Sequence, residues 1–122
     1  MIIGTGVDIE RIDRFRGMNR DKNKAFFSRV FTPKEIDYCF SKKSPEQHLA
    51  VRFAAKEAAI KALHHVPKFK TIDFFQIEVQ QSSVGAPFIH VPKKKELRQI
   101  IIHLSMSHAD EYVVAFVVVE RK

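Results

Sequence analysis

The sequence predicts an α+β domain in which a mainly antiparallel sheet packs against one long helix. Helix signals are concentrated in the first half of the chain, and alternating apolar and polar residues, typical of strands, dominate the second half. The chain has 122 residues, which is the length of one domain. We therefore expect residues 1–122 to form a single domain.

The first thirty residues predict a strand, a short helix and a loop. Residues 2–9 resemble a strand in which Gly4 and Gly6 allow close approach of another backbone. Residues 10–18 predict a short helix, and residues 19–24 a polar loop. An apolar cluster follows: Phe26, Phe27, Val30 and Phe31.

Two helix starts are well marked. Thr32-Pro33-Lys34-Glu35 combines a capping residue, a proline at the first helical position and a glutamate at the third. Ser44-Pro45-Glu46-Gln47 repeats this pattern and predicts capping by Ser44. The second start opens the longest predicted helix, about residues 45–64, which has ended by Pro67.

The second half predicts strands. Residues 75–80 alternate between apolar and polar, 82–87 predict a turn, and 88–91 a partner strand. Residues 92–99 predict a short basic helix. Residues 101–107 and 112–120 predict a closing hairpin joined by 108–111.

The composition narrows the range of partners. Lys plus Arg is 21 and Asp plus Glu is 14, so the formal net charge is +7. A basic balance suggests an anionic partner: nucleic acid, a phosphorylated small molecule, a membrane surface or an acidic protein. Composition does not choose among these four.

The location is predicted by what the sequence lacks. The single cysteine, Cys39, fits a reducing compartment. No apolar run approaches the roughly 20 residues of a membrane span, and the N-terminal residues lack a signal-peptide pattern. We expect a cytoplasmic protein that does not act at a membrane.

The long helix carries the first candidate site residues. At about 100° per residue, Glu57 and Lys61 share a face with apolar neighbours: Ala50, Phe53, Ala54 and Ile60. A surface ion pair at this spacing is common and contributes a few tenths of a kcal/mol. A charged pair against a core face is instead costly unless a bound metal or phosphate compensates it.

Asp8 and His108 are further candidates. Asp8 lies near the end of the first strand, where it could cap the next helix or hold a hard cation. Mg²⁺ is usually held by one or two carboxylates plus substrate phosphates, which Asp8 and Glu57 could supply if they meet. His108 follows an alternating strand, a place where histidines are more often structural or surface-exposed than catalytic.

Three segments together resemble the holo-acyl-carrier-protein synthases. Gly4-Thr5-Gly6-Val7-Asp8-Ile9 with Ile12-Asp13-Arg14-Phe15 is similar to their opening motif, and Arg52-Phe53-Ala54-Ala55-Lys56-Glu57-Ala58 with Lys61-Ala62-Leu63 to their central motif. Leu104-Ser105-Met106-Ser107-His108, with Tyr112 and Ala115, is similar to their C-terminal motif. The segments occur in the family's order and spacing and span nearly the whole chain.

The resemblance implies a 4′-phosphopantetheinyl transferase fold, a homotrimer with active sites at subunit interfaces, and a role in fatty acid biosynthesis. It implies Mg²⁺-dependent transfer of 4′-phosphopantetheine from coenzyme A to a serine of an acidic apo-acyl carrier protein, releasing adenosine 3′,5′-bisphosphate. By motif position, Asp8 and Glu57 become metal ligands and Lys61 a phosphate contact beside them. Arg52 and His108 become contacts to the nucleotide end of coenzyme A.

One segment departs from the family's pattern. Where the family usually has glycines after the central motif, this chain has His64-His65-Val66-Pro67. That loop normally lies near the cofactor. We therefore assign no site residue to it.

The implied reaction needs a base and a docking surface. The serine must lose its proton, and Glu57 itself or a water on the metal are the two candidates. Basic residues are dense just after Asp8, and of these we assign Arg14, Arg20 and Lys24 to docking of the acidic carrier protein.

A small basic nucleic-acid-binding domain is the alternative function. It would suit the net charge. It does not account for an acid and a lysine on an apolar helix face, and the sequence holds no recognised nucleic-acid motif.

Overall fold

A computed structural model describes residues 1–92 and 95–122. Three strands form an antiparallel sheet in the order β1-β5-β4, and two more form a separate antiparallel hairpin. The strands are β1 (Ile2–Arg11), β2 (Glu78–Gln81), β3 (Pro87–His90), β4 (Ile100–Ala109) and β5 (Tyr112–Arg121). The helices are α1 (Lys24–Val30), α2 (Pro33–Phe40) and α3 (Pro45–Leu63).

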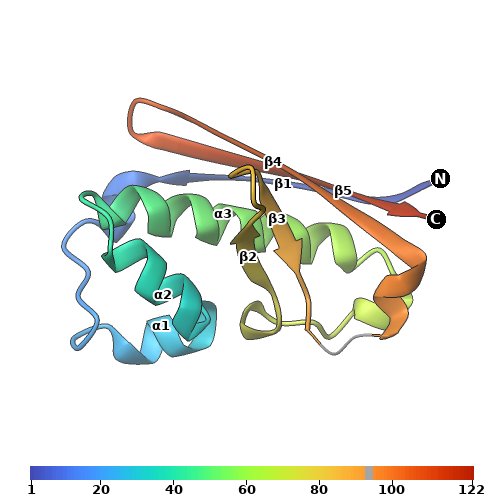
Figure 1. The fold of residues 1–122 in the computed structure, drawn as a ribbon, viewed down its shortest axis with the longest axis horizontal. Coiled ribbons are helices and arrows are strands. Elements are labelled where there is room, and N and C mark those ends of the chain that lie inside the picture. Colours follow the sequence, from blue (N-terminus) through green and yellow to red (C-terminus); the bar gives the residue numbers. More distant parts are fainter. Residues whose placement is uncertain (93–94) are drawn as a thin grey trace.

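Helix α3 is the centre of the molecule. Figure 1 shows the β1-β5-β4 sheet along one side of α3 and α1 and α2 on the other side, with the β2–β3 hairpin crossing over α3 in this view. Because both sides are covered, α3 is buried almost all round and is rich in small side chains. The predicted α+β class, with a mainly antiparallel sheet against a long helix, is confirmed.

Two glycines let α3 approach β1 backbone to backbone. A Cβ atom on Gly6 would lie 2.0 Å from the Ala58 carbonyl oxygen, and one on Gly4 would lie 2.2 Å from the Ala62 carbonyl oxygen. A side chain of any size is excluded at these positions by the helix itself. The close approach brings the end of β1 against one turn of α3.

The two predicted helix starts differ in outcome. At α2 the capping box is complete, with the Glu35 N–H donating to the Thr32 hydroxyl and the Thr32 N–H to the Glu35 carboxylate. Helix α3 begins at Pro45 as expected, but the Ser44 side chain makes no capping hydrogen bond, so that part of the prediction is wrong. The long helix ends at Leu63, within one residue of its predicted end.

The predicted helix over residues 10–18 is wrong. Strand β1 continues to Arg11, and only one 3₁₀ turn follows, Ile12–Phe15. The Ile12 N–H donates to the Glu111 carbonyl at 2.8 Å, which ties the chain to the β4–β5 turn. Gly17, at φ +80°, then turns the backbone in a way that a helix does not allow.

The alternation over residues 75–80 does not form one strand. A 3₁₀ turn spans Phe74–Gln76, capped by Asp73, whose carboxylate accepts from the Phe74 N–H at 2.8 Å. Strand β2 begins only at Glu78. The local capping bonds of Asp73 override the strand pattern here.

The closing hairpin is tighter than its sequence suggests. Strands β4 and β5 are joined by Asp110 and Glu111 alone, with Asp110 at φ 54°. His108 therefore lies within β4, not in a connecting loop. Of the predicted helix over residues 92–99, residues 95–99 form a 3₁₀ turn, and Lys93 and Lys94 lie outside the described residues.

The sheet face that points away from α3 is apolar and uncovered in the single chain. Val7 and Ile9 on β1 are 54% and 62% exposed, and Phe116 on β5 is 47% exposed. Val7 pairs with Phe116, and Ile9 with Val114, so these side chains form adjoining rows. Among the helices of the described chain, none combines the length and hydropathy needed to cross a membrane.

Candidate active site

The structure brings Asp8 and Lys61 together at the contact between β1 and α3. The Lys61 ammonium donates to the Val7 carbonyl at 3.1 Å and lies 3.4 Å from the Asp8 carboxylate. Among the ion pairs of the described residues, Lys61 thus pairs with Asp8 instead of Glu57. The simple surface pair within one helix, which the spacing of Glu57 and Lys61 allowed, does not form.

Glu57 belongs to the same group, as its electrostatics show. Burial raises the pKa of Glu57, and the negative charge of Asp8 raises it further, against the opposing effects of Lys61 and Arg14. Burial also raises the pKa of Asp8, while Lys61 and Arg14 lower it. The site holds carboxylates that are costly to ionise without an added cation.

Glu10 and Arg14 complete this group, and Glu10 is a residue that the sequence analysis missed. The Arg14 guanidinium lies 2.7 Å from the Glu10 carboxylate and 4.7 Å from the centre of the Phe53 ring. Burial and the nearby Asp8 raise the pKa of Glu10. The available signal was the period of two along β1, which places Glu10 on the same face as Asp8.

The residues present fit a divalent cation held by two carboxylates. One Asp8 oxygen, Oδ2, is buried with no hydrogen-bond partner in the described part of the chain. Across residues 1–92 and 95–122, no three His, Cys, Asp or Glu side chains converge closely enough to enclose a metal. A site with few protein ligands is the kind that Mg²⁺ occupies when waters and substrate phosphates supply the remaining oxygens.

A cavity of about 340 Å³ opens beside Glu57. Its wall includes Phe53 and Phe74, whose rings stack at 5.6 Å, and Arg29 from α1. Glu57 therefore borders a cavity whose wall includes several aromatic rings.

Arg52 lies in a different place. Its side chain is only 3% exposed, and its guanidinium sits 4.0 Å above the Tyr38 ring. It lines a cavity of about 240 Å³ with Lys34, Tyr38 and Gln81, and its Nε atom is buried without a partner among the described residues. Arg52 precedes Glu57 by five residues, which is about 140° around a helix.

Comparison with known proteins identifies the family. The model of the 4′-phosphopantetheinyl transferase superfamily matches residues 4–117. A holo-[acyl-carrier-protein] synthase of Geobacter sp. (strain M21) is 44% identical, over 99% of this chain and all of the relative. One from Thermodesulfovibrio yellowstonii is 43% identical, over 98% and 99%. The chain belongs to the holo-[acyl-carrier-protein] synthases of this superfamily.

Solved structures agree with this assignment. A synthase from Bacillus anthracis in complex with CoA (3′,5′-ADP) superposes with a TM-score of 0.77 at 32% identity, covering 100% of this chain and 99% of the other. One from Helicobacter pylori in complex with coenzyme A gives 0.76 at 33% identity, covering 95% and 99%. The fold and the enzyme class inferred from the sequence motifs are both confirmed.

His108 stands apart from the Asp8 group in the synthase chain. It pairs with Val113 on β5, and the other partner of Val113 is Glu10 on β1. Two strand spacings, about 10 Å, thus separate the His108 and Glu10 backbones. Within one chain, neither His108 nor Arg52 joins the Asp8–Lys61 pair.

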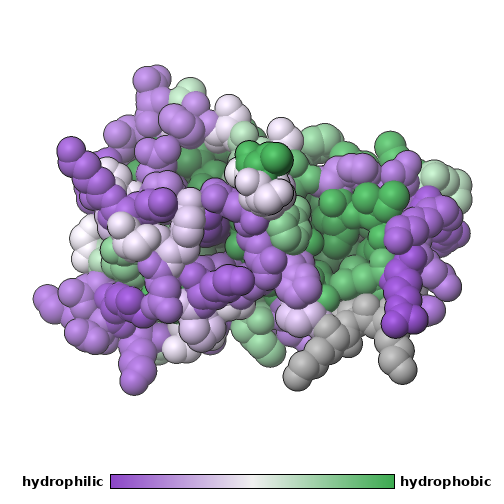
Figure 2. Space-filling view, viewed as in Figure 1, coloured by the Kyte–Doolittle hydropathy of each residue, from purple (hydrophilic) through white to green (hydrophobic). Residues whose placement is uncertain are grey.

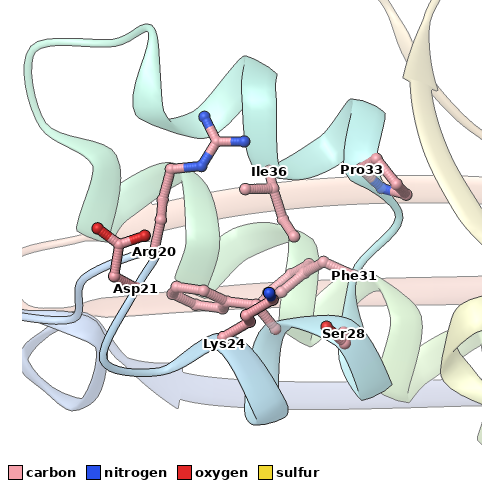
Figure 3. A pocket seen from close by; sticks show the side chains of 8 residues that line it. Arg20, Asp21, Lys24, Ser28, Phe31, Pro33 and Ile36 are labelled. Carbon is pink, nitrogen blue, oxygen red and sulfur yellow. The ribbon is translucent and has the colours of Figure 1, made fainter.

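The three predicted docking residues lie in two different places. Arg14 lies beside Asp8 and Glu57, whose pKa values it lowers. Arg20 and Lys24 instead line a hollow of about 380 Å³ between α1 and α2, together with Phe31 and Ile36 (Figure 3). Arg20 is already paired with Asp37 at 2.6 Å. In Figure 2 the α1–α2 end of the synthase is largely hydrophilic.

Proposed function

We propose that this synthase transfers 4′-phosphopantetheine from coenzyme A to a serine of an acidic apo-acyl carrier protein in the cytoplasm, in support of fatty acid biosynthesis. The observation that carries the proposal is the contact between β1 and α3, which holds Asp8 and Lys61 3.4 Å apart, with Glu57 near enough to be influenced by both. Residues 1–122 act as one domain.

Asp8 and Glu57 hold Mg²⁺ in this proposal. Two observations support this assignment. The Asp8 Oδ2 atom is buried without a hydrogen-bond partner among the described residues, and a bound cation would coordinate this oxygen. The pKa values of both carboxylates are raised, and a bound cation would lower them again by favouring the charged form. When bound, Mg²⁺ neutralises the diphosphate of coenzyme A and stabilises the phosphate that leaves.

The transfer is a phosphoryl-type displacement. The serine oxygen bonds to the phosphorus nearer the pantetheine, and the bond from that phosphorus to the bridging oxygen breaks. Adenosine 3′,5′-bisphosphate leaves with the bridging oxygen. Lys61, which is about half exposed, stabilises the negative charge that develops on the diphosphate oxygens.

Glu57 accepts the serine proton. The cavity beside Glu57 gives the carrier serine a path to the carboxylate.

The synthase acts as a homotrimer with active sites at subunit interfaces. Arg52 and His108 contact the nucleotide end of coenzyme A, yet within one chain both lie apart from the Asp8–Lys61 pair. Subunit interfaces resolve this separation, because residues from two chains can contact one coenzyme A molecule. The exposed apolar rows around Val7 and Phe116 supply a surface for such association.

Arg14 is the main docking residue for the carrier protein, with Arg20 and Lys24 supporting it. Arg14 lies next to the carboxylates at which the serine must arrive, so its positive charge attracts an acidic carrier protein toward Asp8 and Glu57. Nucleic acid and membranes are not partners in this proposal.

The test is mass spectrometry of an acidic apo-carrier protein incubated with the synthase, coenzyme A and Mg²⁺. We expect the carrier to gain one phosphopantetheine group, and we expect no gain with Asp8→Ala, with Glu57→Ala or without the metal. Glu46→Ala, in the first turn of α3, is the matched control and should remain active. Transfer at the wild-type rate by either site variant would overturn the assignment. Salt-sensitive binding of single-stranded DNA without carrier modification would favour the nucleic-acid alternative.

A further inference from the structure

A fully buried ion pair lies behind the Arg52 cavity. The Lys56 ammonium donates to the Glu35 carboxylate at 2.7 Å, and both side chains are 0% exposed. Burying two charges is costly, and replacing such a pair with apolar residues often leaves stability unchanged or improved. Stability alone is therefore a weak explanation for this pair.

The Glu35 carboxylate joins three elements. Besides Lys56 on α3, it accepts hydrogen bonds from the Thr32 N–H at the start of α2 (2.9 Å) and from the Val79 N–H on β2 (2.7 Å). The position and negative charge of the carboxylate are thus fixed by backbone groups.

Glu35 and Arg52 line the same cavity. The Glu35 side chain itself has no exposed surface, so its carboxylate lies beneath this wall. A carboxylate and a guanidinium that lie close together ordinarily attract each other into a bidentate pair. Among the described residues, however, the ion pairs assign Glu35 to Lys56, one helical turn beyond Arg52, and assign no carboxylate to Arg52. The Nε of Arg52 is buried and has no hydrogen-bond partner among the described residues.

We propose that Lys56 is a positioning residue for coenzyme A: by holding the charge of Glu35, it keeps the Arg52 guanidinium available for a phosphate of the nucleotide end. Without Lys56, an uncompensated negative charge would lie beneath the cavity wall. Arg52 would then turn toward Glu35, and a phosphate would be repelled. The inference rests on the proposed function, in which Arg52 contacts coenzyme A.

The first experiment measures the steady-state kinetics of Lys56→Met. We expect the KM for coenzyme A to rise by about tenfold or more, because one partner of a buried charge pair is removed. We expect kcat to stay near the wild-type value, since Asp8, Glu57 and Lys61 are untouched. Lys70→Met, at an exposed site after α3, removes one lysine charge elsewhere and should leave the KM unchanged.

The second experiment is a rescue. Adding Glu35→Gln to Lys56→Met removes the uncompensated charge and should return the KM for coenzyme A toward the wild-type value. Glu35→Gln alone leaves the cavity more positive, so binding of adenosine 3′,5′-bisphosphate, measured by calorimetry, should be equal or tighter even though the protein melts at a lower temperature. That single variant also decides the matter if Lys56→Met fails to fold.

A purely structural pair gives different results. Activity in every variant would then follow the fraction of folded protein. The KM for coenzyme A would be unchanged in Lys56→Met, or Glu35→Gln would bind the nucleotide more weakly. Either result would overturn the positioning role. Failure of the wild-type synthase to modify the carrier would instead overturn the proposed function. If Arg52→Ala has the wild-type KM for coenzyme A, then Arg52 does not contact coenzyme A and the positioning role is wrong, although the transfer reaction itself stands.

Discussion

The substitution Gly6→Ala tests whether the backbone contact between β1 and α3 builds the active site. A methyl group on Gly6 would lie 2.0 Å from the Ala58 carbonyl oxygen and 3.0 Å from the Ala62 nitrogen. Both atoms belong to the backbone of α3, so no side chain can rotate out of the way. The strand and the helix must separate by about 1 Å to restore an ordinary contact.

The size of the effect follows from this geometry. Overpacking against a rigid neighbour costs about 3 kcal/mol, at the upper end of the usual range. At roughly 4 °C per kcal/mol, the melting temperature should fall by about 12 °C. The same separation stretches the Lys61 contacts to Val7 and Asp8, now 3.1 and 3.4 Å, beyond hydrogen-bonding distance. A misplacement of about 1 Å can lower kcat by about 100-fold in molecules that remain folded.

The assay combines thermal melting with carrier modification measured well below the melting temperature. Gly85→Ala is the matched control, because Gly85 has φ +82° and nothing within 4 Å of an added methyl group. That change should cost about 1–2 kcal/mol from backbone strain alone and leave kcat intact. A wild-type kcat in folded Gly6→Ala would refute the idea that this contact positions the catalytic groups.

Four further predictions concern the site and its surfaces. Glu57→Gln should raise the melting temperature of metal-free protein at about pH 8. The pKa of Glu57 is raised in the folded state, so the folded protein loses stability as the pH rises through that pKa, and the neutral Gln avoids this loss. The difference in melting temperature between variant and wild type should vanish below about pH 4, and a lower melting temperature for the variant at pH 8 would contradict the argument. Lys61→Ala should lower kcat about 100-fold with little change in melting temperature, and an activity loss that only follows unfolding would make Lys61 structural. In the proposed homotrimer, Phe116→Glu should shift sedimentation from trimer to monomer, whereas a Phe116→Glu variant that keeps the trimer mass would place the interface elsewhere. Arg14→Glu should raise the KM for the carrier protein, more so at low salt, with little change in the KM for coenzyme A. The double variant Arg20→Glu with Lys24→Glu should raise the carrier KM less, because Asp37 already pairs with Arg20. An unchanged carrier KM in both variants would leave these charges without a docking role.

The sequence predicted elements that depend on local bonds better than elements that depend on distant contacts. The α2 capping box, the extent of α3 and the β4–β5 hairpin depend on bonds between near neighbours, so local patterns reveal them. The 3₁₀ turn at Ile12–Phe15 depends on a bond from Ile12 to Glu111, a distant partner. The turn at Phe74–Gln76 had a local signal in Asp73, which the alternating pattern obscured.

The candidate site shows the same division between local and distant information. The motif positions predicted Asp8, Glu57 and Lys61 as site residues, and the glycines of β1 indicated a close approach of another backbone. Which groups meet was a tertiary result, since Lys61 lies beside Asp8, 53 residues away, instead of its helical neighbour Glu57. Arg52 and His108 were named in the same way, but their separation from Asp8 within one chain depends on the rotation of α3 and on strand order.

The sequence by itself determined the fold class, the family and the identity of the charged groups, because these reside in residue types and their spacing. The tertiary structure alone decided which charges face each other and which remain available. Lys56 illustrates the difference: the sequence shows it only as one residue of the central motif, whereas packing on both sides of α3 buries it completely against Glu35. The pairing of a buried charge is set by the elements that fold around it, and a pattern read along one helix does not contain them.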